Sequence, residues 1–331
     1  MKLSKILPVA IIGIASIFAL TLVFNNDSVS AENYSATSQE DKYVTIEVAN
    51  ESGELIEVEF PQDPERIVVL NLQTLDFLDA MGLGDKIVGV IKEGVFPDYL
   101  QKYVDDPDIA NVGGMKDLDM EAIMSLQPDV IFSSDRTKSK YKELSMIAPT
   151  MASYIDYTVG FMDSYKTLAQ NHSLIFDVGN ELESIIADYD SRIQKIAEFA
   201  DGKTALLGIF AGGLNTLGNS GRCSIIVNEM NFHNLAADEN VNHGNISSYE
   251  SWLKYDPEYM FIIDKDNAVG TEAVAAKEQM ETNNPLIEQT QAYKNNKIIY
   301  LTPSDVWYMA DGGITGMDLM ISCIEEGLGL K

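Results

Sequence analysis

The sequence has few of the residues from which enzymes and metalloproteins build reactive sites. Its 331 residues include three histidines and two cysteines, and the cysteines lack the spacing of metal ligands. It contains no G-x-S-x-G, no H-E-x-x-H, no phosphate-binding loop and no C-x-x-C motif. These absences argue against a hydrolase and against a catalytic metal site built by the protein alone. We therefore expect a protein that is not an enzyme.

Positive charge is also scarce in this chain. Twenty-three Lys and Arg residues oppose 51 Asp and Glu residues, so the formal net charge is −28. A charge of this sign excludes nucleic acid and anionic membrane surfaces as partners. There are four arginines, Arg66, Arg136, Arg192 and Arg222. Any site for an anion must be local and built from a few cations that point at the ligand, because the overall field repels anions.

The N-terminus has the pattern of an export signal. Two lysines within the first five residues precede an apolar run over residues 6–24, and small residues end the segment at Ala31. We predict a signal peptide over residues 1–31 that is cleaved after Ala31. An uncleaved anchor is the alternative, because nineteen apolar residues nearly span a bilayer. No cysteine lies near the junction, so we expect an exported protein, periplasmic or at the cell surface, without a lipid-modified cysteine.

The rest of the chain divides into two lobes and a helical link. Polar residues 32–42 predict a disordered tether. From residue 43 to 160, a hairpin and then alternating strands and helices predict an N-terminal α/β lobe with a mostly parallel sheet. Residues 161–201 have helical periodicity with one break, which predicts a linking helix, either single or a short helix followed by a long one. The α/β pattern resumes in a C-terminal lobe over residues 202–331.

Two stretches that lie 129 residues apart share one pattern. Residues 119–136 and residues 248–265 each contain a helix N-cap, a short helix, a Pro-acid turn, an apolar strand, and then Asp followed by a cation. The cations are Arg136 and Lys265. Ligands of open α/β sheets bind outside the carboxyl ends of the strands, so we predict that both lobes supply a cation to a cleft for an anion. The repeat indicates an ancient duplication of one lobe. The alternative is that the two lobes acquired the same pattern of strand and helix independently.

Further candidate residues lie in loops of the C-terminal half. Arg222 follows a glycine-rich segment and directly precedes a predicted helix, where unpaired amides favour an anion. His243 lies in a polar loop next to a glycine, and Trp307 and Tyr308 lie between the last strand and the last helix. The alternative interpretations give these residues no ligand role. Arg222 would be an ordinary surface arginine, His243 an exposed histidine, and the Trp-Tyr pair part of the core. We interpret His172 as structural because it lies on a predicted helix.

The two cysteines and a glycine-rich segment give no evidence of a reactive site. Cys223 and Cys323 either form a disulfide or remain buried free thiols. Residues 212–218 are rich in glycine but lack the Lys-Ser/Thr end of a phosphate-binding loop. We interpret them as a mobile turn at the mouth of the cleft.

In their order and spacing, these features resemble the ferric catecholate-siderophore binding proteins of bacterial ABC importers, the CeuE-like group. The resemblance covers the chain from about residue 43. It is carried by these segments of the sequence: Phe132–Arg136, Ile147–Thr150, Ser220–Arg222, His243-Gly244, Asp264-Lys265, Lys297–Leu301 and Trp307-Tyr308.

The resemblance implies a fold, a ligand and a set of site residues. The fold is two Rossmann-like lobes joined by a long rigid α-helix, the class III arrangement of periplasmic binding proteins. Arg136, Arg222 and Lys265 would surround the anionic iron–catecholate complex. Beside them we expect Trp307 to contact the ligand. His243 and Tyr308 would coordinate Fe(III) where the siderophore leaves two positions empty, a role that suits imidazole nitrogen and phenolate oxygen.

The implied function is capture of a ferric catecholate siderophore and its delivery to an ABC permease. The iron would arrive as the siderophore complex, with no intrinsic cofactor, and the protein would act as a monomer. This sequence departs from the resemblance in having Lys265 where relatives commonly carry Arg, which costs fork geometry, and Cys223 where they carry an aromatic residue. Binding of haem or cobalamin by the same fold is the alternative. An exported hydrolase or an adhesion module is a third class, opposed by the missing nucleophile motif and the absence of tandem repeats.

Overall fold

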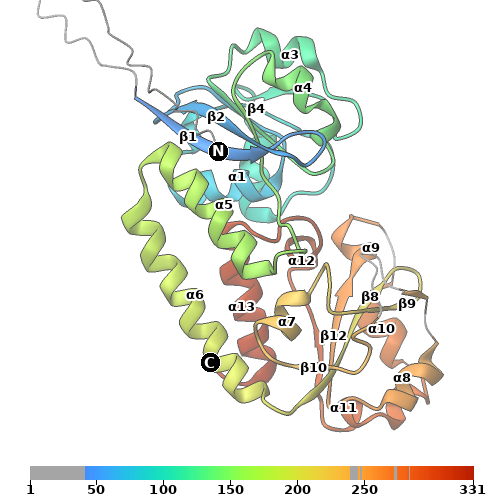
Figure 1. Cartoon of the computed structure of the whole chain (residues 1–331). Helices are drawn as coiled ribbons and strands as arrows, with labels where there is room; N and C mark the ends of the chain where they lie inside the picture. Colours follow the sequence, from blue (N-terminus) through green and yellow to red (C-terminus); the bar gives the residue numbers. More distant parts are fainter. Residues whose placement is uncertain (1–41, 239–244, 247, 272–273, 283) are drawn as a thin grey trace, which may run out of the picture. The chain divides into compact units, whose positions relative to one another are not determined.

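The computed structural model describes residues 42–238, 245–246, 248–271, 274–282 and 284–331 (Figure 1). The predicted signal peptide and all but the last residue of the predicted tether lie outside these residues. The described residues belong to one compact unit, Asp41–Lys331. Within them, no helix has both the length and the apolar character needed to cross a membrane.

The N-terminal lobe begins with an antiparallel hairpin. Its strands are β1 (Tyr43–Ala49) and β2 (Leu55–Pro61). Asn50 organises the turn between them, because its side-chain oxygen accepts hydrogen bonds from the amides of Ser52 and Glu54 at 2.9 and 3.1 Å. Such Asx turns are the reason that asparagine is favoured between strands. The predicted hairpin is therefore confirmed.

Five parallel strands form the main sheet of this lobe, in the order β5-β4-β3-β6-β7. Alternate residues of the central strand β3 enter different core clusters, Val68 on one face and Val69 on the other. Both faces are thus buried, as expected for a parallel sheet with helices on both sides. In chain order the elements are β3 (Ile67–Val69), α1 (Leu72–Ala80), β4 (Ile87–Val90), α2 (Gln101–Asp105), β5 (Ala110–Asn111), α3 (Met120–Ser125), β6 (Val130–Ser133), α4 (Tyr141–Ser145) and β7 (Thr150–Ala152).

Two helices, α5 (Phe161–Phe176) and α6 (Gly179–Ala200), form the link between the lobes (Figure 1). The break occurs at Asp177, which has the left-handed conformation with φ 55°. Of the two predicted alternatives, a short helix followed by a long one is confirmed. The 22 residues of α6 span about 33 Å at 1.5 Å per residue. Its Leu182 packs into the core of the N-terminal lobe, and its Ile193 packs into the core of the C-terminal lobe.

The C-terminal lobe contains a mixed sheet of six strands. Five strands run in one direction (β8, β10, β11, β12 and β13), whereas β9 lies between β8 and β11 and is antiparallel to both. In chain order the elements are β8 (Thr204–Phe210), β9 (Leu214–Leu217), α7 (Ser224–Asn228), β10 (His233–Asn234), β11 (Asn245–Ile246), α8 (Tyr249–Tyr255), β12 (Tyr259–Asp264), α9 (Lys265–Ala268), α10 (Ala276–Glu281), α11 (Gln291–Lys294), β13 (Ile298–Tyr300), α12 (Ser304–Met309) and α13 (Ile314–Leu328).

The glycine-rich segment 212–218 is not the mobile turn that the sequence predicted. Residues 214–217 form β9, which pairs with β8 and buries Leu214 and Leu217. Gly212, with φ 65°, makes the tight connection between the two strands. The glycines therefore serve a hairpin, and the residues that follow them belong to the sheet.

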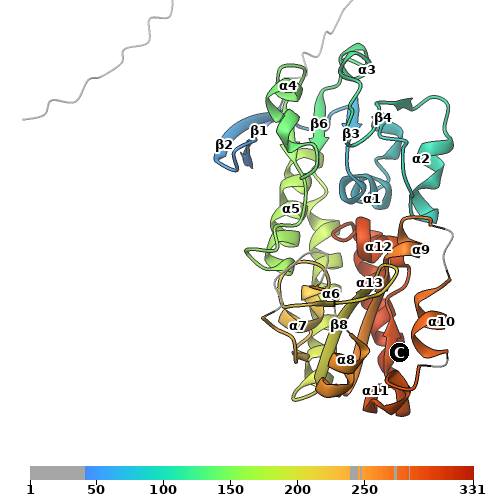
Figure 2. The same cartoon turned by 90° about the vertical axis from the view of Figure 1, so that its right-hand side faces the viewer.

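Asp76 of α1 joins the N-terminal lobe to the last helix of the chain. Its carboxylate accepts hydrogen bonds from the amides of Thr315 and Gly316 at 2.8 and 2.7 Å, at the N-terminus of α13. A carboxylate there is favoured by the unpaired amides and by the helix dipole. Asp76 is fully buried, and this burial raises the pKa of its carboxyl group. Figure 2 shows α1 next to α13, so this contact and α6 both restrain the lobes.

The two cysteines are free and buried in the same core cluster. Burial raises the pKa of both the Cys223 and the Cys323 thiol. Of the two alternatives left open by the sequence, the structure shows free thiols. Thiols with a raised pKa are poor nucleophiles, so these side chains act as small apolar core residues.

Candidate functional site

A cleft of about 890 Å³ lies between the two lobes. Its walls come from the N-terminal lobe (residues 71–73, 115, 134–136 and 138), from residues 154–158 ahead of α5, and from the C-terminal lobe (residues 220–222, 269, 308, 309 and 311). In the N-terminal lobe these segments follow the carboxyl ends of β3, β6 and β7. The cleft therefore lies where ligands of α/β sheets bind.

Arg136 lines the cleft from the turn after β6. The turn is fixed by Ser134 and Thr137, because the Ser134 amide donates to the Thr137 hydroxyl at 2.8 Å and the two hydroxyls lie 3.0 Å apart. Arg136 itself is exposed, and no ion pair joins it to a carboxylate of the described residues. Its guanidinium is thus held on a rigid turn and available to an anion that enters the cleft.

Arg222 lines the same cleft from the C-terminal lobe, directly ahead of α7. Its Nε donates a hydrogen bond to the backbone carbonyl of Tyr308 at 3.1 Å. The guanidinium carbon lies 4.3 Å from the centre of the Tyr308 ring, which is a cation–π contact. Arg222 and Tyr308 therefore form one preorganised unit, in which an always-charged group stacks on an aromatic ring at the cleft surface.

Asp311 and Tyr157 form a buried hydrogen-bonded pair on the cleft wall. Asp311 is 7% exposed, and the Tyr157 hydroxyl donates a hydrogen bond to its carboxylate. Burial raises the pKa of Asp311, while the Tyr157 hydrogen bond and the nearby Arg222 lower it. Burial and the Asp311 charge raise the pKa of Tyr157 well above its usual value. This pair holds the segment ahead of α5 to the C-terminal lobe, next to Arg222.

The third cation of the cleft is Lys138, which the sequence interpretation missed. Lys138 lies in the same turn as Arg136, pairs with Asp135 at 2.7 Å and lies 5.8 Å from the centre of the Tyr154 ring. Its position two residues after Arg136 was the available signal. The cations Arg136, Lys138 and Arg222 thus share the lining with the carboxylates of Asp135, Asp156 and Asp311.

Lys265, the predicted third cation, is not among the residues that line the cleft. Asp264 caps the next helix by accepting the amide of Asn267 at 3.1 Å, so Lys265 becomes the first residue of α9. After β6 the chain instead continues as an open turn that carries Arg136 into the cleft. The repeated pattern therefore predicts a corresponding strand in each sheet, β6 and β12. It does not predict whether the cation that follows the strand lies in the cleft.

Trp307 and Tyr308 are adjacent but have different surroundings. Tyr308 lines the cleft and is 5% exposed, whereas Trp307 is 1% exposed and packs in the core of the C-terminal lobe. The prediction that Trp307 contacts the ligand does not fit this placement. His243 lies outside the described residues, so the structure gives no position for it.

A metal ion would find few protein ligands in the described part of the chain. There, no three His, Cys, Asp or Glu side chains form a group that could hold a metal ion. Tyr308 is the predicted metal ligand that does line the cleft, where its phenol oxygen could supply one ligand to iron.

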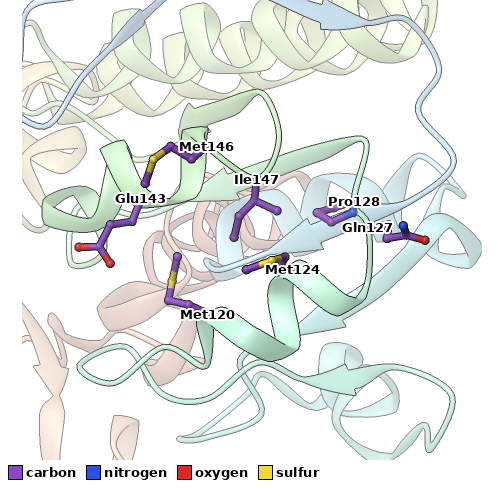
Figure 3. A pocket seen from close by; sticks show the side chains of 7 residues that line it. All are labelled: Met120, Met124, Gln127, Pro128, Glu143, Met146 and Ile147. Atoms are coloured by element: carbon purple, nitrogen blue, oxygen red, sulfur yellow. The ribbon is translucent and has the colours of Figure 1, made fainter.

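A second hollow lies on the N-terminal lobe and differs in chemistry. Figure 3 shows its side chains, among them Met120, Met124 and Met146, around a volume of about 560 Å³. Glu143 is the one charged residue in this lining. A hollow with methionines and a carboxylate does not suit an anion, so the anion site is assigned to the cleft between the lobes.

Comparison with known proteins finds relatives over most of the chain. The profile of the family described as "Periplasmic binding protein" matches residues 67–304. The petrobactin-binding protein YclQ of Bacillus subtilis (strain 168) is 35% identical over 275 residues, which cover 81% of this chain and 84% of the relative. The ferric-anguibactin-binding protein FatB of Vibrio anguillarum is 27% identical over 272 residues, covering 80% of this chain and 82% of the relative.

Solved structures agree with the sequence relatives. The crystal structure of YclQ superposes with a TM-score of 0.78 at 30% identity, covering 87% of this chain and 99% of that one. The periplasmic catecholate-siderophore binding protein VctP of Vibrio cholerae also gives a TM-score of 0.78, at 27% identity, covering 86% of this chain and all of that one.

Proposed function

We propose that this chain, which belongs to the periplasmic binding protein family, captures a ferric catecholate siderophore between its lobes and delivers it to an ABC permease for iron uptake. Proteins of this family are the substrate-binding components of ABC transporters and are not enzymes. The observation that carries the proposal is that Arg136 and Arg222, from different lobes, line one cleft. Two of the four arginines of a strongly acidic chain thus face the same space.

The chemistry of the cleft matches that of a ferric catecholate. Such a complex is multiply anionic, partly aromatic and large. The cleft offers three cations and the rings of Tyr154, Tyr157 and Tyr308, in a volume of about 890 Å³. Two relatives, YclQ and VctP, are named for binding petrobactin and catecholate siderophores. Haem or cobalamin remains the competing ligand class, and three cations in one cleft favour the more highly charged iron–catecholate complex.

An affinity panel tests this function. The purified chain without residues 1–31 should show quenching of its tryptophan fluorescence with a ferric bis-catecholate, since Trp307 directly precedes the cleft residue Tyr308 on α12. We expect binding of this complex to be much tighter than binding of ferric citrate, haem or cobalamin. If ferric citrate binds equally well, the catecholate assignment is wrong. A haem spectrum with a Soret shift and tighter binding would instead support the competing class.

We also propose that Tyr308 completes the coordination of iron when the siderophore supplies four oxygens. His243 is proposed for the remaining position. Tyr308→Phe should therefore reduce the charge-transfer absorption of the complex with a four-oxygen catecholate, because the phenolate oxygen is lost, and have a smaller effect with a six-oxygen one. Tyr154→Phe is the matched control, because this tyrosine also lines the cleft. Equal spectra for Tyr308→Phe and the unmodified protein would remove Tyr308 from the metal.

The compartment and assembly follow from the same proposal. A chain that passes its ligand to an ABC permease acts outside the cytoplasm, in the periplasm or at the cell surface, which agrees with the predicted signal peptide. We propose that it acts as a monomer, because both walls of the cleft come from a single chain.

A further inference from the structure

A small apolar cavity lies beside the cleft, lined by the N-terminal lobe and by Met309 of α12. It has a volume of about 60 Å³ and lies at the carboxyl ends of β3 and β4, with residues 93–96 on one side. Its walls contain six aliphatic side chains that are each at most 6% exposed: Val69, Leu70, Leu72, Leu75, Val90 and Ile91. We call this cavity the apolar annex.

The apolar annex and the cleft share part of their walls. Asn71, Leu72, Met115 and Met309 line both spaces. Methionine is unbranched and adapts its shape easily, so Met115 and Met309 form a deformable boundary between them. The Asn71 amide is already engaged, because its oxygen accepts the Thr74 amide at 2.7 Å and its nitrogen donates to the Ser133 carbonyl at 2.9 Å.

The size and polarity of the annex select the kind of group that fits. Apart from Asn71 and Glu93, all lining residues are apolar, and an apolar space of this kind favours apolar groups over water. Cavities that bind benzene measure about 150 Å³, so a catechol ring does not fit into 60 Å³. A narrow apolar space of this volume suits a short alkyl chain.

We propose that the apolar annex binds a short alkyl segment of the ligand while the cleft binds its anionic iron–catecholate part. This inference rests on the proposed function and narrows the substrate class to ferric catecholates with an aliphatic segment next to the chelating groups. The cations of the cleft fix the complex by charge, and the annex distinguishes between complexes of equal charge.

Two synthetic ferric bis-catecholates test the inference in the unmodified protein. They are identical except that the linker carries a propyl group in one and a hydroxyethyl group of the same length in the other. Burial of a methylene strengthens binding about fourfold, and burial of a hydroxyl without a partner weakens it. We therefore expect the propyl complex to bind at least about tenfold more tightly, measured by fluorescence titration.

Filling the annex provides the matched variants. Val69→Ile combined with Val90→Ile adds two methylenes to its wall, and should reduce the preference for propyl to about twofold or less without changing the affinity for the hydroxyethyl complex. Val68→Ile is the control, because Val68 is buried in the same strand but belongs to the core cluster on the other face. This control should keep the full preference.

The outcomes separate the two proposals. Tight and equal binding of both complexes by the unmodified protein overturns the alkyl site and leaves the proposed function intact. If neither complex binds, the proposed function fails, and the inference fails with it. An unchanged propyl preference in the filled variant also overturns the annex. If that variant does not fold, the comparison of the two complexes in the unmodified protein still decides.

Discussion

Replacing both Arg136 and Arg222 by alanine is expected to weaken binding of a ferric bis-catecholate by about a hundredfold to a thousandfold. Loss of one partner from a buried, hydrogen-bonded charge pair in an interface costs roughly 2–5 kcal/mol, and every ~1.4 kcal/mol is a factor of ten. Arg136 is exposed and should contribute less than the half-buried Arg222. The double change also leaves Lys138 alone against the carboxylates of Asp135, Asp156 and Asp311, which repel an anionic complex.

The control for this prediction is Lys140→Ala. Lys140 lies four residues after Arg136, is exposed and pairs with Glu143 at 3.0 Å, and it does not line the cleft. It removes one positive charge from the same region and should change the affinity less than twofold, because an exposed charge outside the cleft is screened by salt. Titration of each variant at fixed ionic strength measures the effect. Equal affinities of the double variant and Lys140→Ala would show that the two arginines do not hold the ligand.

Acidification from pH 7 to pH 4 is expected to lower the free energy of unfolding by about 3 kcal/mol through His172 alone. His172 is 1% exposed, stacks between Phe77 and Phe132, and lies 3.1 Å from the Thr74 hydroxyl through Nε2. Burial lowers the pKa of its imidazole from 6.5 to about 4. The unfolded chain therefore binds a proton at a higher pH than the folded one, and stability falls as the pH drops through this window.

The variant His172→Gln isolates this effect from the titration of carboxylates. It should be less stable at pH 7, since it loses the ring stacking, yet its stability should fall about 3 kcal/mol less than that of the unmodified protein between pH 7 and pH 4. Urea unfolding at several pH values gives both numbers. Parallel pH profiles of the two proteins would show that His172 does not titrate as a buried neutral group.

The architecture followed from the sequence because it depends on local periodicity. The alternation of strands and helices and the break between α5 and α6 agree with the structure. The class III arrangement implied by the resemblance is confirmed by the structural relatives. The prediction for segment 212–218 was wrong. Its glycines suggested a loop, but the segment contains β9, which pairs with β8 across a tight turn. Strand pairing is a tertiary property that composition does not reveal.

The candidate site could be predicted only in part, because side-chain direction depends on where each short helix begins. Trp307 and Tyr308 are neighbours on α12, and successive residues of a helix point about 100° apart, so one faces the core and the other the cleft. Lys265 does not line the cleft, because Asp264 caps α9 and Lys265 becomes the first residue of that helix. Asp311 and Tyr157 were missed because their partnership joins residues 154 positions apart.

The most direct test of the account is a crystal structure of the chain with a ferric bis-catecholate bound. We predict that the complex lies in the cleft between the lobes, that Arg136 and Arg222 both contact its catecholate oxygens, and that Tyr308 lies next to the iron. A complex bound elsewhere, for example in the methionine-lined hollow of the N-terminal lobe, with both arginines free of it, would contradict the account.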